Sequence, residues 1–292
     1  MPAQWPFVLN VIGPGAEQAA LLAALAAALP RHGEPVTLKP SHAFDVPFDG
    51  DPAAVRAARE AAHGLDINVI PAANRRKKLL VADMDSTIIG CECLDEVARM
   101  AGHGPEVAAI TERAMRGEVD FAAALRERVK LLKGLPVELL ARVYAERVRL
   151  NAGARALVAT MRANGAKTIL VSGGFNFFTE RVAVDAGFDS QQANHLLEAD
   201  NRLTGEVAEP ILGREAKLHA LERAVTENGL SFEDALAVGD GANDLAMIKR
   251  AGLGVAWHAK PVLAEAAKAV IAHGDLTALL YLQGYKVEEF VR

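Results

Sequence analysis

The sequence predicts an α/β protein whose parallel sheet is interrupted, after its first strand, by a helical insertion. Short apolar runs that suit buried parallel strands alternate with helical patterns in the second part of the chain. A long helical stretch separates the first two of these runs, and a shorter βαββαβ pattern precedes them all. The chain therefore divides into a small N-terminal α+β unit and a larger α/β domain.

The N-terminal unit, residues 1–75, is predicted from strand and helix patterns in the order βαββαβ. Its expected elements are strands over 7–12, 36–39, 43–48 and 66–70 and helices over 17–29, which ends at Pro30, and over 52–63, which begins at Pro52. The basic run Arg75-Arg76-Lys77-Lys78 follows, and we expect it to be a solvated linker.

The larger domain, residues 76–292, is predicted to hold the parallel sheet. Its expected strands cover 79–82, 168–171, 235–238 and 253–256, and a small hairpin is expected over 197–207. The region 94–149 is helical in pattern, with breaks at Gly102, Gly117 and Gly134-Leu135-Pro136. We therefore predict a core over 76–90 and 151–292, with an inserted helical cap over 91–150.

Composition narrows the possible function classes. The net charge is −5 and the pI is about 5.9, so the chain lacks the basic excess that nucleic-acid binding uses, and no nucleic-acid partner is expected. Two cysteines, Cys91 and Cys93, are too few for a disulfide framework or a structural zinc site. No signal-peptide pattern and no apolar run of about 18–20 residues is present, so we expect a soluble, cytoplasmic protein without a membrane partner.

Two carboxylates follow the first strand of the predicted sheet, in Asp83-Met84-Asp85-Ser86-Thr87. In open α/β sheets, ligands bind beyond the carboxyl ends of the strands. Paired carboxylates there can hold a hard divalent cation, or divide the roles of nucleophile and acid/base. An isolated pair of this kind is more often a turn that caps a helix.

The next two strand ends carry matching chemistry. Ser172-Gly173-Gly174 follows the second strand, where backbone N–H groups can approach an anion closely. The loop 239–244 follows the third strand and supplies Asp240 for a cation, with Asn243 and Asp244 as polar neighbours. Lys217, in the helical stretch 214–228, could add a positive charge for a phosphoryl group, although a lone helical Lys is usually a surface residue.

These motifs, in this order, resemble the four motifs of the haloacid dehalogenase superfamily of phosphatases. The segments 83–92, 126–136, 171–175 and 237–244 are similar to the phosphoserine phosphatases of that superfamily in particular. The resemblance implies a Rossmann-like core with a helical cap. It also implies hydrolysis of the small molecule O-phospho-L-serine to L-serine and phosphate, which is the final step of L-serine biosynthesis.

The resemblance also implies roles for the core residues. Asp83 would attack phosphorus and form an aspartyl-phosphate, while Asp85 would protonate the leaving group and then activate water. One Mg²⁺ would be held by the carboxylates of Asp83 and Asp240 and by the backbone carbonyl of Asp85. The phosphoryl oxygens would be bound by Ser172, the Gly173 amide and Lys217, with Asn243 completing the pocket. Asp244 would orient Lys217 or metal-bound water rather than bind the metal.

Two charged residues of the predicted cap match family positions that hold a zwitterionic amino acid. Glu92 would bind the ammonium group, and Arg128 would bind the carboxylate as a fork. Without the resemblance, the plainer interpretation is that Glu92 caps the helix that begins near Leu94 and that Arg128 is solvated or paired along its helix.

The N-terminal unit resembles the amino-acid-binding, ACT-like module in its element order alone. The role of this unit remains open: it could bind serine, pair two copies of the chain into a homodimer, or do neither. Two rival functions also remain: a phosphatase or phosphotransferase of the same superfamily acting on another small phosphomonoester, such as phosphohomoserine, and a catalytically idle amino-acid sensor.

Overall fold

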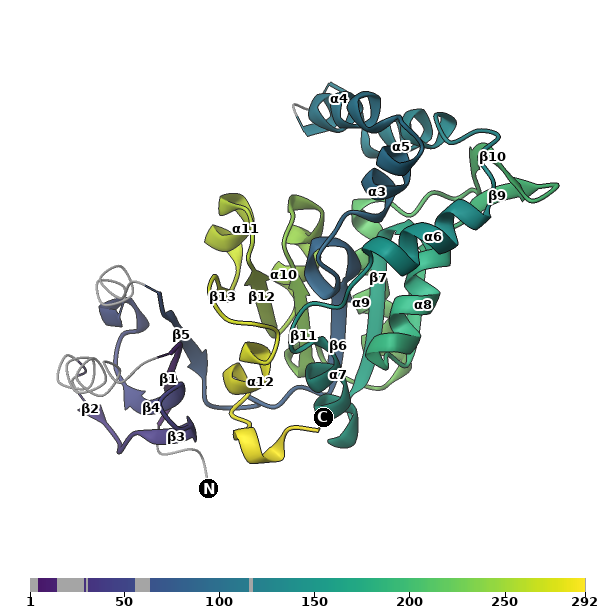
Figure 1. Cartoon of the computed structure of the whole chain (residues 1–292). Coiled ribbons are helices and arrows are strands. Elements are labelled where there is room, and N and C mark those ends of the chain that lie inside the picture. The colour runs from purple at the N-terminus through teal and green to yellow at the C-terminus, as the bar shows by residue number, and fades with distance from the viewer. Residues whose placement is uncertain (1–4, 15–28, 30, 56–63, 116–117, 292) are drawn as a thin grey trace.

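The computed structural model describes residues 5–14, 29, 31–55, 64–115 and 118–291. Figure 1 shows the α/β core in the centre, the N-terminal unit beside it and the helical cap at one end. Within these described ranges, no helix is both long and apolar enough to cross a membrane.

The N-terminal unit forms an antiparallel sheet in the order β2-β4-β1-β5, with β3 also paired to β4. Its strands are β1 (Phe7–Ile12), β2 (Arg31–His32), β3 (Val36–Lys39), β4 (Ala43–Asp49) and β5 (Asp66–Pro71), with a short 3₁₀ turn at Pro52–Val55. The four predicted strands are therefore confirmed. The helix predicted over 17–29 lies, apart from Leu29, outside the described residues, as does the 56–63 part of the second helix.

The core is a six-stranded parallel sheet in the order β13-β12-β11-β6-β7-β8. Its strands are β6 (Leu79–Asp83), β7 (Lys167–Phe175), β8 (Ser190–Asn194), β11 (Ala235–Gly239), β12 (Leu253–Trp257) and β13 (Ala269–Ile271). The four predicted strands are confirmed as the central ones. The edge strands β8 and β13 were not predicted, because short edge strands lack the two-sided apolar pattern of central ones.

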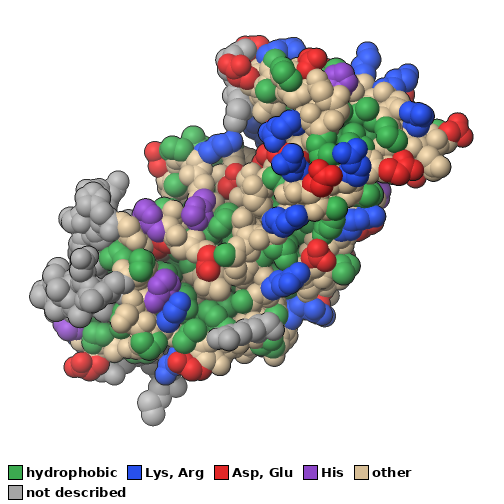
Figure 2. All heavy atoms as spheres, in the orientation of Figure 1, with side chains coloured by type: hydrophobic (Ala, Val, Ile, Leu, Met, Phe, Trp, Pro, Cys, Tyr) green, Lys and Arg blue, Asp and Glu red, His purple; other side chains and the backbone are tan. Residues whose placement is uncertain are grey.

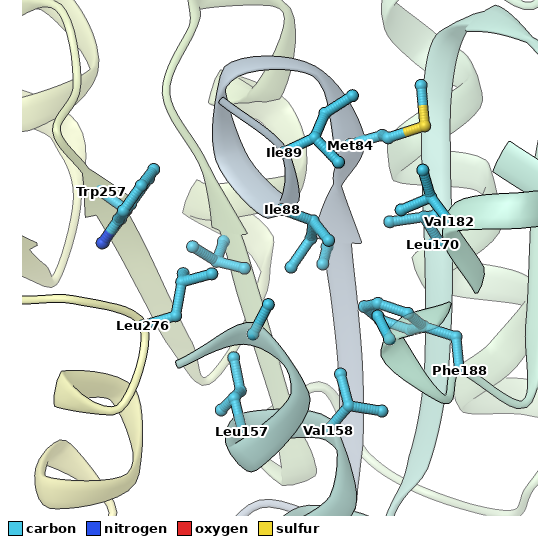
Figure 3. Close-up of a cluster of buried hydrophobic side chains, with 14 of the residues drawn as sticks. Met84, Ile88, Ile89, Leu157, Val158, Leu170, Val182, Phe188, Trp257 and Leu276 are labelled. Atoms are coloured by element: carbon cyan, nitrogen blue, oxygen red, sulfur yellow. The ribbon is translucent and has the colours of Figure 1, made fainter. Parts of the chain in front are cut away.

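Both faces of the core sheet are buried, which explains why its central strands are apolar throughout. In β6, Leu80 and Ala82 pack into one hydrophobic cluster, whereas Leu79 and Val81 pack into the cluster on the opposite face. Figure 3 shows part of the first cluster, where Leu157 and Val158 approach the sheet. The core helices are α7 (Ala154–Ala163), α8 (Asn176–Ala186), α9 (Arg214–Glu227), α10 (Leu245–Arg250), α11 (Pro261–Ala266) and α12 (Ala278–Leu282).

The inserted cap consists of helices, as predicted. These are α3 (Cys93–Met100), α4 (Gly104–Met115), α5 (Phe121–Lys130) and α6 (Glu138–Arg147). The two linkers that join the cap to the core run side by side, since Ile89 pairs with Leu150 and the Gly90 amide donates to the Arg149 carbonyl at 3.2 Å.

The cap is also bonded to the predicted hairpin, which consists of β9 (Leu196–Ala199) and β10 (Arg202–Val207). Leu203 donates its amide to the Leu135 carbonyl at 2.9 Å and accepts from the Gly134 amide at 2.8 Å. The Val137 amide donates to the Asn201 carbonyl at 3.0 Å. The cap segment 134–137 therefore lies along the hairpin, where Pro136 pairs with Arg202 (Figure 1).

The basic run after the N-terminal unit is not a solvated linker, which corrects the prediction for two of its residues. The Arg75 guanidinium bonds both Asp45 oxygens and the main-chain carbonyls of Tyr281 and Leu282. Lys77 is 7% exposed and donates to the Asn74 and Glu233 carbonyls. The sequence pattern did not predict these contacts, because the run lies between the N-terminal unit and the core, and the packing of these two parts depends on the tertiary fold.

Candidate active site

Three charged residues from different elements form a buried cluster at the carboxyl end of the core sheet. The Lys217 ammonium lies 2.6 Å from Asp83 Oδ1 and 2.6 Å from Asp244 Oδ1. The exposed fractions of Asp83, Lys217 and Asp244 are 4%, 3% and 0%. Asp244 therefore contacts Lys217, and Lys217 is a buried residue rather than the surface residue of the plainer interpretation.

The charges of this cluster are out of balance. Burial, together with the neighbouring Asp244, raises the pKa of Asp83 well above its usual value, against the opposing effect of Lys217. Burial alone would lower the pKa of Lys217, but Asp244 and Asp83 raise it, so this ammonium stays charged. A lone ammonium thus faces two buried carboxylates, and the site favours additional positive charge.

Asp240 adds a third carboxylate and completes a candidate cation site. Oxygens of Asp83, Asp240 and Asp244 lie within 4.8 Å of one another. Burial and the nearby Asp244 raise the pKa of Asp240. A set of carboxylate oxygens suits a hard divalent cation, which would also correct the charge imbalance. The residues present therefore fit a divalent metal.

The hydrogen bonds of Asp244 favour a positioning role over metal ligation. Its Oδ1 accepts from Lys217, and its Oδ2 accepts from the Gly241 amide at 3.1 Å. Gly239 permits this approach, since a Cβ at that residue would lie 2.3 Å from Asp244 Cγ. Asp83 is different, because both its Lys217 contact and its bond from the Met84 amide, at 2.8 Å, go to Oδ1. No hydrogen bond to its Oδ2 is found among the described residues.

Asp85 lies where the core meets the cap. Its Oδ2 accepts from the Ser172 hydroxyl at 2.8 Å, and its Oδ1 accepts from the Cys93 amide, in the first turn of α3, at 2.9 Å. Ser172 Oγ in turn accepts from the Gly174 amide at 2.8 Å. The first two predicted loops are therefore in direct contact, with the Asp85 side chain beside the Ser-Gly-Gly loop.

Two site residues were not identified from the sequence. Thr87 donates to Asp240 Oδ1 at 3.2 Å and its carbonyl accepts from Asn151 Nδ2 at 2.8 Å, which links two strand-end loops to the second cap linker. The Phe121 ring of the cap lies over the Ser-Gly-Gly loop, because a Cβ at Gly173 would be 3.1 Å from its Cζ. An aromatic residue at the start of a cap helix was the available signal for Phe121. Asn243 folds back over Gly241, where an added Cβ would lie 2.4 Å from its Oδ1.

Glu92 and Arg128 face the same region from the cap. Glu92 Oε1 accepts from Ser86 Oγ at 2.6 Å. Water reaches this carboxylate, yet the surrounding protein and the nearby Asp85 raise its pKa to about 7. Burial lowers the pKa of Arg128, and the charges of Asp95, Glu92 and Asp85 oppose that shift. Arg128 therefore lies within electrostatic reach of both Glu92 and Asp85.

The geometry weakens the plainer interpretation of Glu92, whereas Arg128 does make a contact along its own helix. Glu92 occupies the N-cap position of α3, but its side chain makes no capping hydrogen bond. Arg128 is half-buried, and its Nε donates to the Ala124 carbonyl at 3.3 Å within its own helix. Figure 2 shows side chains of both charges near the boundary between cap and core.

Comparison with known families agrees with this geometry. The family described as haloacid dehalogenase-like hydrolase matches residues 80–249, which include the core motifs and the cap. The chain belongs to the haloacid dehalogenase-like hydrolases.

Two sequence relatives and one solved structure are similar to this chain over 68% or more of its length. The phosphoserine phosphatase of Streptococcus thermophilus is 48% identical over 200 residues, which cover 68% of this chain and 93% of the relative. That of Archaeoglobus fulgidus is 47% identical over 77% of this chain, although the match spans only 66% of the relative. A solved structure of a probable phosphoserine phosphatase from Vibrio cholerae superposes with a TM-score of 0.79 at 31% identity, covering 98% of this chain and 88% of that one.

Proposed function

We propose that this protein is a phosphoserine phosphatase, which hydrolyses O-phospho-L-serine to L-serine and phosphate in the cytoplasm, as the last step of L-serine biosynthesis. The observation that carries the proposal is the buried Asp83–Lys217–Asp244 cluster, with Glu92 and Arg128 facing it from the cap. The relatives of the same name, at 47% and 48% identity, support it.

The core residues have contacts that suit a two-step phosphoryl transfer. Asp83 Oδ2 attacks phosphorus while Lys217 and the Met84 amide hold Oδ1, so one oxygen is fixed and the other reacts. Asp85 gives its proton to the serine oxygen as the phosphorus–oxygen bond breaks. It then takes a proton from the water that hydrolyses the aspartyl-phosphate. Its bonds to Ser172 and the Cys93 amide orient its carboxyl group.

The phosphoryl group has a defined set of partners in this proposal. Ser172, the Gly173 amide and Lys217 bind its oxygens, and Asn243 completes the pocket. Mg²⁺ would be held by the carboxylates of Asp83 and Asp240 and by the Asp85 carbonyl, and when bound it would neutralise part of the phosphoryl charge.

The cap recognises the amino-acid part of the substrate. Glu92 binds the ammonium group, and Arg128 binds the carboxylate through its two-pronged guanidinium. Phe121 covers the Ser-Gly-Gly loop and excludes bulk water from the reacting phosphoryl group.

Phosphate release by the purified protein, with and without Mg²⁺, tests the proposal. The substrates are O-phospho-L-serine, O-phospho-L-homoserine, phosphothreonine, a sugar phosphate and an aryl phosphate. We expect turnover only with Mg²⁺, and phosphoserine to exceed the sugar phosphate and the aryl phosphate, which lack the charged groups that Glu92 and Arg128 bind, by at least about tenfold in kcat/KM. A preference for phosphohomoserine would replace the substrate assignment, and no turnover of any ester would support the idle sensor instead.

A further inference from the structure

The N-terminal unit is joined to the core by side chains that take the place of strand pairing. Asn68 of β5 lies beside β13, the edge strand of the core sheet. Its Nδ2 donates to the Val270 carbonyl at 3.0 Å, and its Oδ1 accepts from the Val270 amide at 2.8 Å. One amide side chain thus satisfies both main-chain groups of an edge-strand residue, as a neighbouring strand would.

Asp66, two residues earlier, binds the turn that follows β13. Its Oδ1 accepts from the Ala272 amide at 2.7 Å and the His273 amide at 3.2 Å, and its Oδ2 accepts from the Gly274 amide at 2.8 Å. The residue is 3% exposed. A buried carboxylate that accepts three successive amides fixes the conformation of turn 272–274, because charge-assisted bonds are stronger than neutral ones.

The turn 272–274 is bonded in turn to the segment after β12. The His258 amide donates to the Ile271 carbonyl at 2.7 Å, and His258 Nε2 lies 2.8 Å from the Gly274 carbonyl. His258 has φ of 46°, a left-handed conformation that needs support from its surroundings. Two residues further on, the Lys260 amide donates to the Asp240 carbonyl at 3.1 Å.

These contacts form one continuous path from the N-terminal unit to the metal loop. We propose that Asp66 is a positioning residue for Asp240, acting through turn 272–274 and the segment 258–260. The inference rests on the proposed function in one respect, since it takes Asp240 as a metal ligand. The N-terminal unit then serves catalysis within its own chain, without a ligand or a second copy bound to it.

Mg²⁺ binding by the substrate-free full chain tests this role, with calorimetry as the readout. A second readout needs no metal: in a Trp5→Phe background, Trp257 is the remaining tryptophan, and it adjoins His258 with ring centroids 4.3 Å apart. Figure 3 shows Trp257 in the same hydrophobic cluster as Leu276, a residue that closely follows turn 272–274 in the sequence. Its emission therefore reports on the turn and on the segment that it supports.

Three variants make the test specific. Asp66→Asn places an amide N–H against the main-chain amides. Asp49→Asn is the matched control, since this carboxylate belongs to the same unit but is exposed and pairs only with Arg31, at 3.3 Å, among the described residues. His258→Asn keeps a residue that tolerates positive φ but shortens the side chain that reaches Gly274, and it covers the case in which Asp66→Asn fails to fold.

We expect Asp66→Asn to weaken Mg²⁺ binding by about fivefold, somewhat less than the loss of a group that contacts a ligand directly. Trp257 emission should shift, His258→Asn should change both readouts in the same direction, and Asp49→Asn should change neither. A lower Tm with unchanged Mg²⁺ affinity and unchanged emission would reduce Asp66 to a purely structural contact and overturn the proposal. If the unaltered protein takes up no Mg²⁺, the proposed function fails instead, and Trp257 emission alone decides the role of Asp66.

Discussion

The core and the cap hold their functional side chains in different ways. In the core, Asp83, Lys217 and Asp244 are at most 4% exposed, and they lie at strand ends or on helices packed against the sheet. In the cap, water reaches Glu92 and Arg128 is half-buried, on a body joined to the core through two linkers. Fixed, buried charge suits chemistry common to all phosphate esters, whereas in the proposed function the cap would contact only the part that distinguishes one ester from another. Substitutions in the two regions should therefore differ in which substrates they affect.

The strongest test of this difference is Asp83→Asn. Loss of a covalent nucleophile should lower kcat by about 10⁴-fold or more, and equally for phosphoserine and an aryl phosphate. The fold should persist, because burial and Asp244 already disfavour a charge at this residue, so the neutral amide is tolerated. Steady-state kinetics and circular dichroism check this pair of outcomes, and substantial residual turnover would remove Asp83 from its role.

Arg128→Ala should separate the substrates. Loss of a charged hydrogen-bond partner for the carboxylate should raise KM for phosphoserine about 10- to 100-fold. KM for an aryl phosphate should stay within about threefold, because that substrate has no carboxylate. Arg126→Ala is the matched control, since this residue of the same helix is exposed and pairs with Glu209. Equal increases for both substrates would contradict the division between core and cap.

The pH dependence of Glu92 sharpens the comparison. Its pKa is raised to about 7, so below that pH the carboxyl group is increasingly protonated and loses its attraction for an ammonium group. The ratio of kcat/KM for phosphoserine to that for an aryl phosphate should rise with pH between 6 and 8, by up to about tenfold per unit below the pKa. Titration of the core groups cancels in this ratio. In Glu92→Gln, the ratio should be low and independent of pH, and a slope that persists there would place the titration elsewhere.

The smallest effect is expected for Cys91→Ser, next to Glu92. Its thiol lies 3.8 Å from the Arg147 carbonyl and also contacts the Cys93 thiol, and the proposed reaction uses no thiol. Both kcat and KM should stay within about twofold for every substrate, because replacing a half-exposed side chain by one of similar size has little effect on the stability of the fold. A selective loss with phosphoserine would show that the conformation of the first linker depends on this side chain.

The sequence was most informative where chemistry follows a strong local pattern. Asp83, Ser172 and Asp240 were predicted to converge because each ends an apolar parallel strand, and the hydrogen bonds between their loops bear out that convergence. Phe121 was missed because its position over Gly173 depends on how the cap closes onto the core. The prediction that Arg75 is solvated was wrong. This residue lies between the N-terminal unit and the core, and no local sequence pattern indicates how those two parts pack together. Contacts that follow from the order of strands in the core sheet were predictable, and contacts of the core with the cap or with the N-terminal unit were not.

The bond between cap segment 134–137 and strand β10 has a consequence for protein engineering. A chimaera that exchanges residues 91–150 alone would leave the Asn201 and Leu203 main-chain groups facing an unrelated loop. A graft that carries residues 196–207 along with the helices would preserve those bonds. The transferable unit that carries the cap is thus discontinuous in sequence, and its natural boundaries include a hairpin that belongs to the core by chain order.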